Sequence, residues 1–114
     1  MPLLPDLTWR APDRRPGPGV VVHTYLELRR LRDVPAFFLA SMATYRQAIG
    51  SPGIRSVRLT AQPLARRFRT ASEWDDAAAA RSYASAEPHR TVMRAWRDRM
   101  GAAEITVEGA LPSA

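Results

Sequence analysis

The chain has 114 residues, and its 17 basic residues against 11 acidic residues give a formal net charge of +6. This length supports one domain with a modest core, so burying surface in a homodimer would add stability. All 17 basic residues are arginine and cysteine is absent, which excludes Schiff-base chemistry, thiol nucleophiles, disulfides and cysteine-ligated metals.

The arginines are spread along the chain without a block of five or six. Arginine without lysine, together with abundant alanine and proline, is typical of a GC-rich genome, so we expect no nucleic-acid partner. The N-terminus lacks a signal-peptide pattern, and no window approaches the 18 apolar residues of a membrane span. We therefore expect a soluble, cytoplasmic protein with no membrane partner.

Residues 1–19 contain five of the ten prolines and two glycines. Proline supplies no backbone donor and favours turns, so we expect an irregular arm with Trp9 as its only large apolar anchor. Residues 110–114 are expected to form a short tail, which leaves residues 20–109 as the folded domain.

The first regular element is a strand over residues 20–28, with apolar side chains on both faces. A helix follows from a cap at Asp33 to a stop at Gly50, because apolar residues recur there at helical spacing. This stripe is expected to face the core; it comprises Val34, Phe37, Phe38, Met42, Tyr45 and Ile49.

Residues 54–61 and 65–74 are predicted to form a pair of strands around a turn. Asp75 or Asp76 is expected to cap an alanine-rich helix over residues 77–86, and Pro88 suits the first turn of a renewed helix reaching Met100. The pattern leaves open whether the two helical segments are kinked or separate. Alternation over residues 104–108 predicts a last strand.

The predicted order is β-α-β-β-α-β, an α+β, ferredoxin-like protomer with helices on one face of a four-stranded antiparallel sheet. The first strand is apolar on both sides and no second helical layer is predicted. Packing two sheets face to face across a dimer axis would bury the uncovered face. We therefore expect a homodimer.

His89 is the strongest candidate for chemistry. It follows Pro88 at a helix start and lies four residues before Met93 and seven before Trp96, on the apolar face. Burial and the helix dipole disfavour imidazolium and favour a neutral ring that accepts a proton or binds iron. The structural alternative is a buried histidine whose ring is satisfied by a carbonyl or a carboxylate.

His23 shares a strand face with Val21 and Tyr25, so it faces either a pocket or the dimer interface. Because no partner is evident for this side chain, a structural role is the better interpretation. Arg69 lies on a strand, where a solvated edge residue is the default. If its side chain pointed inward, it would select an anionic or phenolate-bearing ligand.

Trp74 ends a strand and Tyr83 follows nine residues later on the alanine-rich helix. Both are compatible with simple core packing. With Phe68, Thr70 and Ser72 on the same strand face as Trp74, they also form an apolar wall with hydroxyl groups, which is typical of small-molecule pockets.

The segment from Phe68 to Trp96 resembles the dimeric α/β-barrel superfamily. The similarity is to antibiotic-biosynthesis-monooxygenase-like proteins, with an uncharacterised branch related to spheroidene monooxygenase as the nearest, and it covers residues 20–108. The branch usually carries Trp where this chain has Arg69. The motif residues are Phe68, Thr70, Ser72, Trp74, Asp75, Asp76, Tyr83, Pro88, His89, Arg90 and Met93.

The resemblance implies a homodimeric ferredoxin-like protein with a pocket between sheet and helices. Its lead implication is a cofactor-independent monooxygenase that oxidises a polycyclic phenolic or polyketide-type aromatic substrate. His89 would help to deprotonate the substrate, Arg69 or Tyr25 would stabilise the phenolate, and Trp74 and Phe68 would stack on the rings. The alternatives are haem binding with His89 as the axial ligand and a non-catalytic, dimeric ligand-binding module.

Overall fold

The computed structural model describes residues 6–12, 17 and 19–109. Its strands are β1 (Asp6–Arg10), β2 (Val20–Leu28), β3 (Ile54–Gln62), β4 (Arg67–Trp74) and β5 (Met100–Gly109). Its α-helices are α1 (Val34–Ile49), α2 (Ala77–Ser85) and α3 (His89–Trp96). Short 3-10 turns precede α1, connect β3 to β4 and connect α3 to β5.

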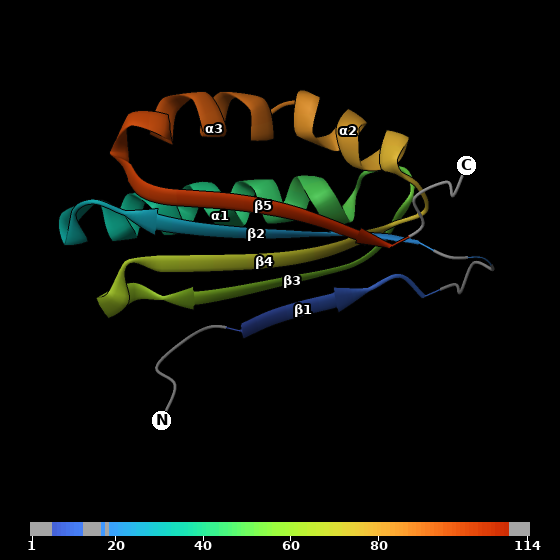
Figure 1. Ribbon diagram of the computed structural model, residues 1–114, viewed down its shortest axis with the longest axis horizontal. Coiled ribbons are helices and arrows are strands. Elements are labelled where there is room, and N and C mark those ends of the chain that lie inside the picture. Colours follow the sequence, from blue (N-terminus) through green and yellow to red (C-terminus); the bar gives the residue numbers. More distant parts are fainter. Residues whose placement is uncertain (1–5, 13–16, 18, 110–114) are drawn as a thin grey trace.

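The strands form one antiparallel sheet in the order β1-β3-β4-β2-β5. Figure 1 shows them side by side, with α2 and α3 following one another along the β5 side. The predicted α+β, ferredoxin-like class is confirmed, with helices packed on one face. None of the described helices is long and apolar enough to cross a membrane.

The sheet has five described strands, so the prediction of four was wrong. The additional strand, β1, comes from the segment expected to be irregular. It pairs with β3 at the sheet edge, where Trp9 lies opposite Val57 and packs against the core. The prolines of the arm misled the prediction because they flank this five-residue strand and do not interrupt it.

The helices begin and end close to the predicted residues. Asp33 and Gly50 flank α1, although the Asp33 side chain makes no capping hydrogen bond. The two helical segments after β4 are separate helices, α2 and α3, with residues 86–88 between them. The last strand is longer than the predicted residues 104–108, since β5 pairs with β2 along its whole length.

Two apolar clusters fill the space between sheet and helices. The first surrounds Phe37 and Phe68, whose rings meet edge to face at a centroid distance of 4.8 Å, with Trp96 on the other side of Phe37. The second surrounds Trp74 and Val57. The space between β2, β4 and the helices therefore has rigid aromatic walls at both ends.

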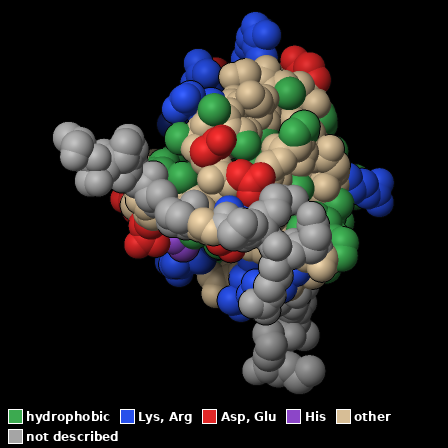
Figure 2. Space-filling model, turned by 90° about the vertical axis from the view of Figure 1, so that its right-hand side faces the viewer, with side chains coloured by type: hydrophobic (Ala, Val, Ile, Leu, Met, Phe, Trp, Pro, Cys, Tyr) green, Lys and Arg blue, Asp and Glu red, His purple; other side chains and the backbone are tan. Residues whose placement is uncertain are grey.

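The other face of the sheet is largely polar, although Val21 and Tyr25 of β2 lie on it, as expected for the first strand. Arg69 lies over the ring of Tyr25 at 5.0 Å, and His23 Nε2 lies 2.8 Å from the Glu108 carboxylate. Opposite charges are also mixed on the end of the molecule shown in Figure 2, among hydrophobic side chains. The net positive charge is thus not concentrated on the surface of that view.

Candidate functional site

A pocket of about 160 Å³ lies between the helix-facing side of the sheet and helices α1, α2 and α3. Its floor consists of side chains from β2, β3 and β4, and its roof consists of side chains from the three helices. Ala84 on α2 and Ile105 on β5 are exposed lining residues, so the pocket opens between these two elements. The aromatic lining residues are Phe37, Tyr45, Phe68, Trp74, Tyr83 and His89.

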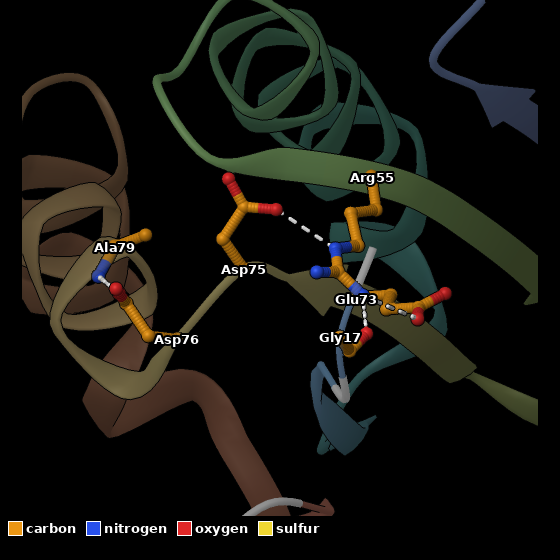
Figure 3. Close-up of polar contacts among 6 residues, drawn as sticks. All are labelled: Gly17, Arg55, Glu73, Asp75, Asp76 and Ala79. Carbon is orange, nitrogen blue, oxygen red and sulfur yellow. Dashed lines mark hydrogen bonds and ion pairs between the residues drawn. The ribbon is translucent and has the colours of Figure 1, made fainter. Parts of the chain in front are cut away.

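The turn between β4 and α2 sets the position of the roof (Figure 3). Asp76 caps α2 by accepting a hydrogen bond from the Ala79 backbone N–H at 2.8 Å. Asp75 instead pairs with the Arg55 guanidinium of β3, also at 2.8 Å. The capping role predicted for this acidic pair is confirmed and belongs to Asp76, while Asp75 ties the turn to the sheet.

His89 begins α3 and lines the pocket. Its Nδ1 lies 3.1 Å from the Ala84 carbonyl oxygen. A carbonyl accepts and does not donate, so Nδ1 carries the proton in this contact and Nε2 keeps its lone pair when the ring is neutral. Nε2 has no hydrogen-bond partner in the described part of the chain. The neutral ring therefore keeps a free lone pair on Nε2, and His89 is one of the residues that line the pocket.

Burial lowers the pKa of His89 below its ordinary value of 6.5, and the hydrogen bond to Ala84 opposes this only in part. The imidazole is consequently neutral at pH 7. The structure agrees with the expected neutral, inward-facing ring. The Ala84 carbonyl is one of the two kinds of partner considered above for a histidine with a purely structural role. That contact occupies Nδ1 alone, so it leaves Nε2 available for chemistry.

Tyr83 connects His89 to the aromatic wall. Its ring centroid lies 4.7 Å from that of His89 and 5.1 Å from that of Trp74. Its hydroxyl donates to the Thr44 carbonyl oxygen at 3.2 Å, and burial raises its pKa to about 12. Tyr83 is thus a neutral wall residue at physiological pH and not a proton carrier.

The floor carries two threonine hydroxyls. Thr24 of β2 and Thr70 of β4 are directly paired across the strands, and both line the pocket. Neither hydroxyl has a hydrogen-bond partner among the described residues, whereas Ser72 accepts the Trp74 indole N–H at 2.9 Å. The Thr24 and Thr70 hydroxyls are therefore available to a ligand.

Solved structures with this architecture are similar to the chain. A putative antibiotic biosynthesis monooxygenase from Nitrosomonas europaea has a TM-score of 0.72 and 17% identity, over 84% of this chain and 93% of that protein. A heme-degrading enzyme from Listeria monocytogenes has a TM-score of 0.70 and 20% identity, over 93% and 68% of the two chains. A putative monooxygenase from Fusobacterium nucleatum has a TM-score of 0.75 and 10% identity, over 89% and 49%.

The chain has the ferredoxin-like fold of antibiotic-biosynthesis-monooxygenase proteins. This confirms the predicted resemblance at the level of the fold. The sequence matches no model of a known protein family, and it matches no curated protein. The chain spans nearly all of the Nitrosomonas protein but only about half of the Fusobacterium protein.

On this monooxygenase-like fold, four of the seven predicted site residues meet at the pocket: Phe68, Trp74, Tyr83 and His89. The other three, His23, Tyr25 and Arg69, lie on the opposite face of the sheet. Within this chain, Arg69 and Tyr25 cannot stabilise a phenolate bound beside His89, so that part of the prediction was wrong. Successive strand residues point to opposite faces, so Arg69 is separated from the pocket by the sheet itself.

Gln47 of α1 is the important residue that sequence reasoning missed. Its side-chain carbonyl accepts the His89 backbone N–H at 2.7 Å, and its amide donates to the Tyr83 carbonyl oxygen at 3.0 Å. These two bonds join α1 to the end of α2 and the start of α3. A polar residue near the end of an apolar helix was the only local signal.

Haem does not fit this pocket as it stands. His89 Nε2 is a suitable donor for iron, but the volume of about 160 Å³ is below the roughly 300 Å³ at which pockets for drug-sized ligands begin. The tilted ring contact with Tyr83 and the hydrogen bond to Ala84 also fix the imidazole within the roof. A macrocycle at Nε2 would have to displace the helices or the sheet.

Proposed function

We propose that this chain is a monooxygenase-like enzyme that oxidises a phenolic aromatic molecule with dioxygen and without a bound cofactor. The observation that carries the proposal is the free Nε2 lone pair of His89, held by the Nδ1 contact to Ala84 in an aromatic-walled pocket. The shared fold with monooxygenases supports the reaction class. The pocket volume supports a cofactor-free site.

In the proposed reaction, the phenol O–H donates a hydrogen bond to Nε2 of His89. The proton moves to Nε2 as the ring passes one electron to dioxygen, and the resulting superoxide joins a ring carbon next to the one that carries the hydroxyl. The O–O bond then breaks as that ring carbon loses its proton and becomes a carbonyl, and the departing oxygen takes up both the ring proton and the proton held on Nε2. The balance is one phenol and one dioxygen giving one quinone and one water.

The lining of the pocket explains why proton and electron transfer are coupled in this scheme. The described lining residues include no arginine or other cation to stabilise a free phenolate. A neutral imidazole with a lowered pKa is a weak base towards a phenol. Movement of the proton together with the electron avoids an isolated charge in this apolar space.

Oxygen uptake by the purified, haem-free protein tests the proposal. With phenolic substrates under labelled dioxygen, we expect one labelled oxygen in the quinone and one in water. His89→Gln is expected to lower kcat/KM at least 100-fold. The matched control is His23→Gln, on the other face of the sheet, which should retain the rate at equal oligomeric state. Full turnover by His89→Gln would overturn the proposal.

The homodimer expected from the sequence also remains part of this proposal. On the outer face of the sheet, Glu104 and Glu108 lie on β5, whereas Arg67 and Arg69 lie on β4. A two-fold rotation places the acidic side of one sheet against the basic side of another.

Sedimentation velocity tests the dimer. We expect the protein to sediment as a dimer, Arg69→Glu to dissociate it, and the double variant Arg69→Glu with Glu104→Arg to restore it. A monomer at all concentrations would contradict the dimer without affecting the chemistry proposed for His89.

The proposal also includes a location in the cytoplasm, which is expected from the sequence.

A further inference from the structure

The pocket volume limits the size of the ligand. The volume of about 160 Å³ is close to that of an apolar cavity of about 150 Å³, which holds a single benzene ring. Buried side chains form the walls: Phe37, Phe68 and Trp74 are each 1% exposed. Because packed aromatic walls at two ends resist displacement, a fused second or third ring would have to disturb the core.

The lining also limits the charge of the ligand. No arginine, aspartate or glutamate lines the pocket among the described residues, and the chain has no lysine. The titratable lining groups are His89, Tyr45 and Tyr83, and burial raises the pKa of both tyrosines. A carboxylate or phosphate would therefore enter this pocket without a cationic partner, which is costly in an apolar environment.

Polar groups face the pocket from two opposite layers. His89 comes from the helical roof, and the paired Thr24 and Thr70 come from the sheet floor. Apolar and aromatic side chains make up most of the remaining lining, which also includes Ser41 and Thr44 of α1 and Ser72 of β4. This arrangement suits a ligand that is polar at both ends and flat and apolar in the middle.

We propose that the substrate is a neutral phenol with one aromatic ring, whose hydroxyl meets His89 and whose second polar substituent meets Thr24 and Thr70. This inference rests on the proposed function, because the phenol is taken to be the molecule that is oxidised. It replaces the polycyclic substrate expected from the sequence, whose fused rings exceed the pocket.

Binding without turnover tests the inference. Calorimetric titrations under nitrogen would compare the dissociation constants of 4-methylphenol, 4-(hydroxymethyl)phenol, 4-hydroxybenzoate and 9-phenanthrol. Competition of each ligand with 4-methylphenol would show whether they bind at the same site. We expect both neutral one-ring phenols to bind at least tenfold more tightly than the benzoate and the three-ring phenol. Tighter binding of 9-phenanthrol or of 4-hydroxybenzoate at that site would overturn the inference.

Thr70→Val tests the second polar contact, because valine keeps the shape of threonine and replaces the hydroxyl with a methyl group. We expect about fivefold weaker binding of 4-(hydroxymethyl)phenol and unchanged binding of 4-methylphenol. Thr60→Val, on the opposite face of the neighbouring strand, is the matched control. Equal loss for both ligands in Thr70→Val would contradict the assignment of the floor hydroxyls.

These binding outcomes are separable from those of the reaction. If one-ring phenols bind but cause no oxygen uptake, the proposed function is contradicted and the proposed ligand class is supported. Oxygen uptake with three-ring phenols, and none with one-ring phenols, would do the opposite.

Discussion

The side-chain carbonyl of Gln47 accepts the backbone N–H of His89 at 2.7 Å, which makes a residue of α1 the cap of α3. The first backbone N–H groups of a helix have no partner within the helix, so an outside acceptor is needed. The other end of the same amide holds the Tyr83 carbonyl at 3.0 Å. Gln47 thus sets the spacing between the last turn of α2, which supplies Ala84, and the imidazole that Ala84 orients.

Removal of this clamp should affect both stability and chemistry. We expect Gln47→Ala to lower the free energy of unfolding by about 1–3 kcal/mol, because a part-buried donor and acceptor lose their partner. We also expect kcat to fall while KM changes little. Urea denaturation and steady-state kinetics measure the two effects. Gln62→Ala, at an exposed position on β3, is the control and should change neither.

The lowered pKa of His89 predicts a pH dependence of stability. His89 has a lower pKa in the folded chain than its ordinary value of 6.5 in the unfolded chain. At a pH between these two values, the unfolded chain binds a proton at His89 more readily than the folded chain does. Stability should therefore fall as the pH falls below 6.5, by up to about 1.4 kcal/mol for each unit by which the pKa is lowered. Unfolding titrations at pH 7.5 and 5.5 should show this loss in the wild type. The loss should be smaller in His89→Gln, and equal losses would contradict the prediction.

Tyr83→Phe should separate wall packing from proton transfer. The variant loses the hydrogen bond to the Thr44 carbonyl, so we expect a loss of about 1 kcal/mol in unfolding free energy. The pKa of Tyr83 is about 12, so the acidic limb of the rate profile should not move. A profile of kcat/KM against pH checks this. A shift of that limb by a full pH unit would show that the hydroxyl takes part in the proton step.

Gly53→Ala should destabilise the junction beneath α2. Gly53 has a φ of +85°, and an added Cβ would lie 2.6 Å from the Cβ of Ala79. Backbone strain and this contact together should cost more than about 1 kcal/mol. Gly50→Ala is the matched control, since an added Cβ there comes no nearer than 3.9 Å to another atom. Thermal unfolding of the two variants should differ clearly.

The parts of the fold that depend on local periodicity were predictable. Alternation placed Phe68 and Trp74 on one face of a strand, and helical spacing placed His89 on the same side as Trp96. β1 was not predicted because its only favourable feature is pairing with β3 at a distance of about 50 residues in the chain. A five-residue edge strand that is flanked by prolines has few sequence features that predict such pairing.

The candidate site was predictable only where side-chain direction follows from the period. The same alternation that points Phe68 into the pocket points Arg69 to the opposite face of the sheet. The prediction for Arg69 was wrong because it considered the charge of arginine and not its position in this alternation. Gln47 was beyond reach, because its two hydrogen bonds span 36 and 42 residues. Such contacts arise from helix packing, which local patterns do not specify.

The tautomer of His89 is the most direct test of the account. Long-range ¹⁵N–¹H spectra of the protein at pH 7.5, with His89→Gln for assignment, report which ring nitrogen carries the proton. We predict a neutral ring with the proton on Nδ1 and an Nε2 resonance that moves when 4-methylphenol binds. A proton on Nε2, or an Nε2 signal indifferent to the phenol, would contradict the assignment of His89 as the base of this pocket.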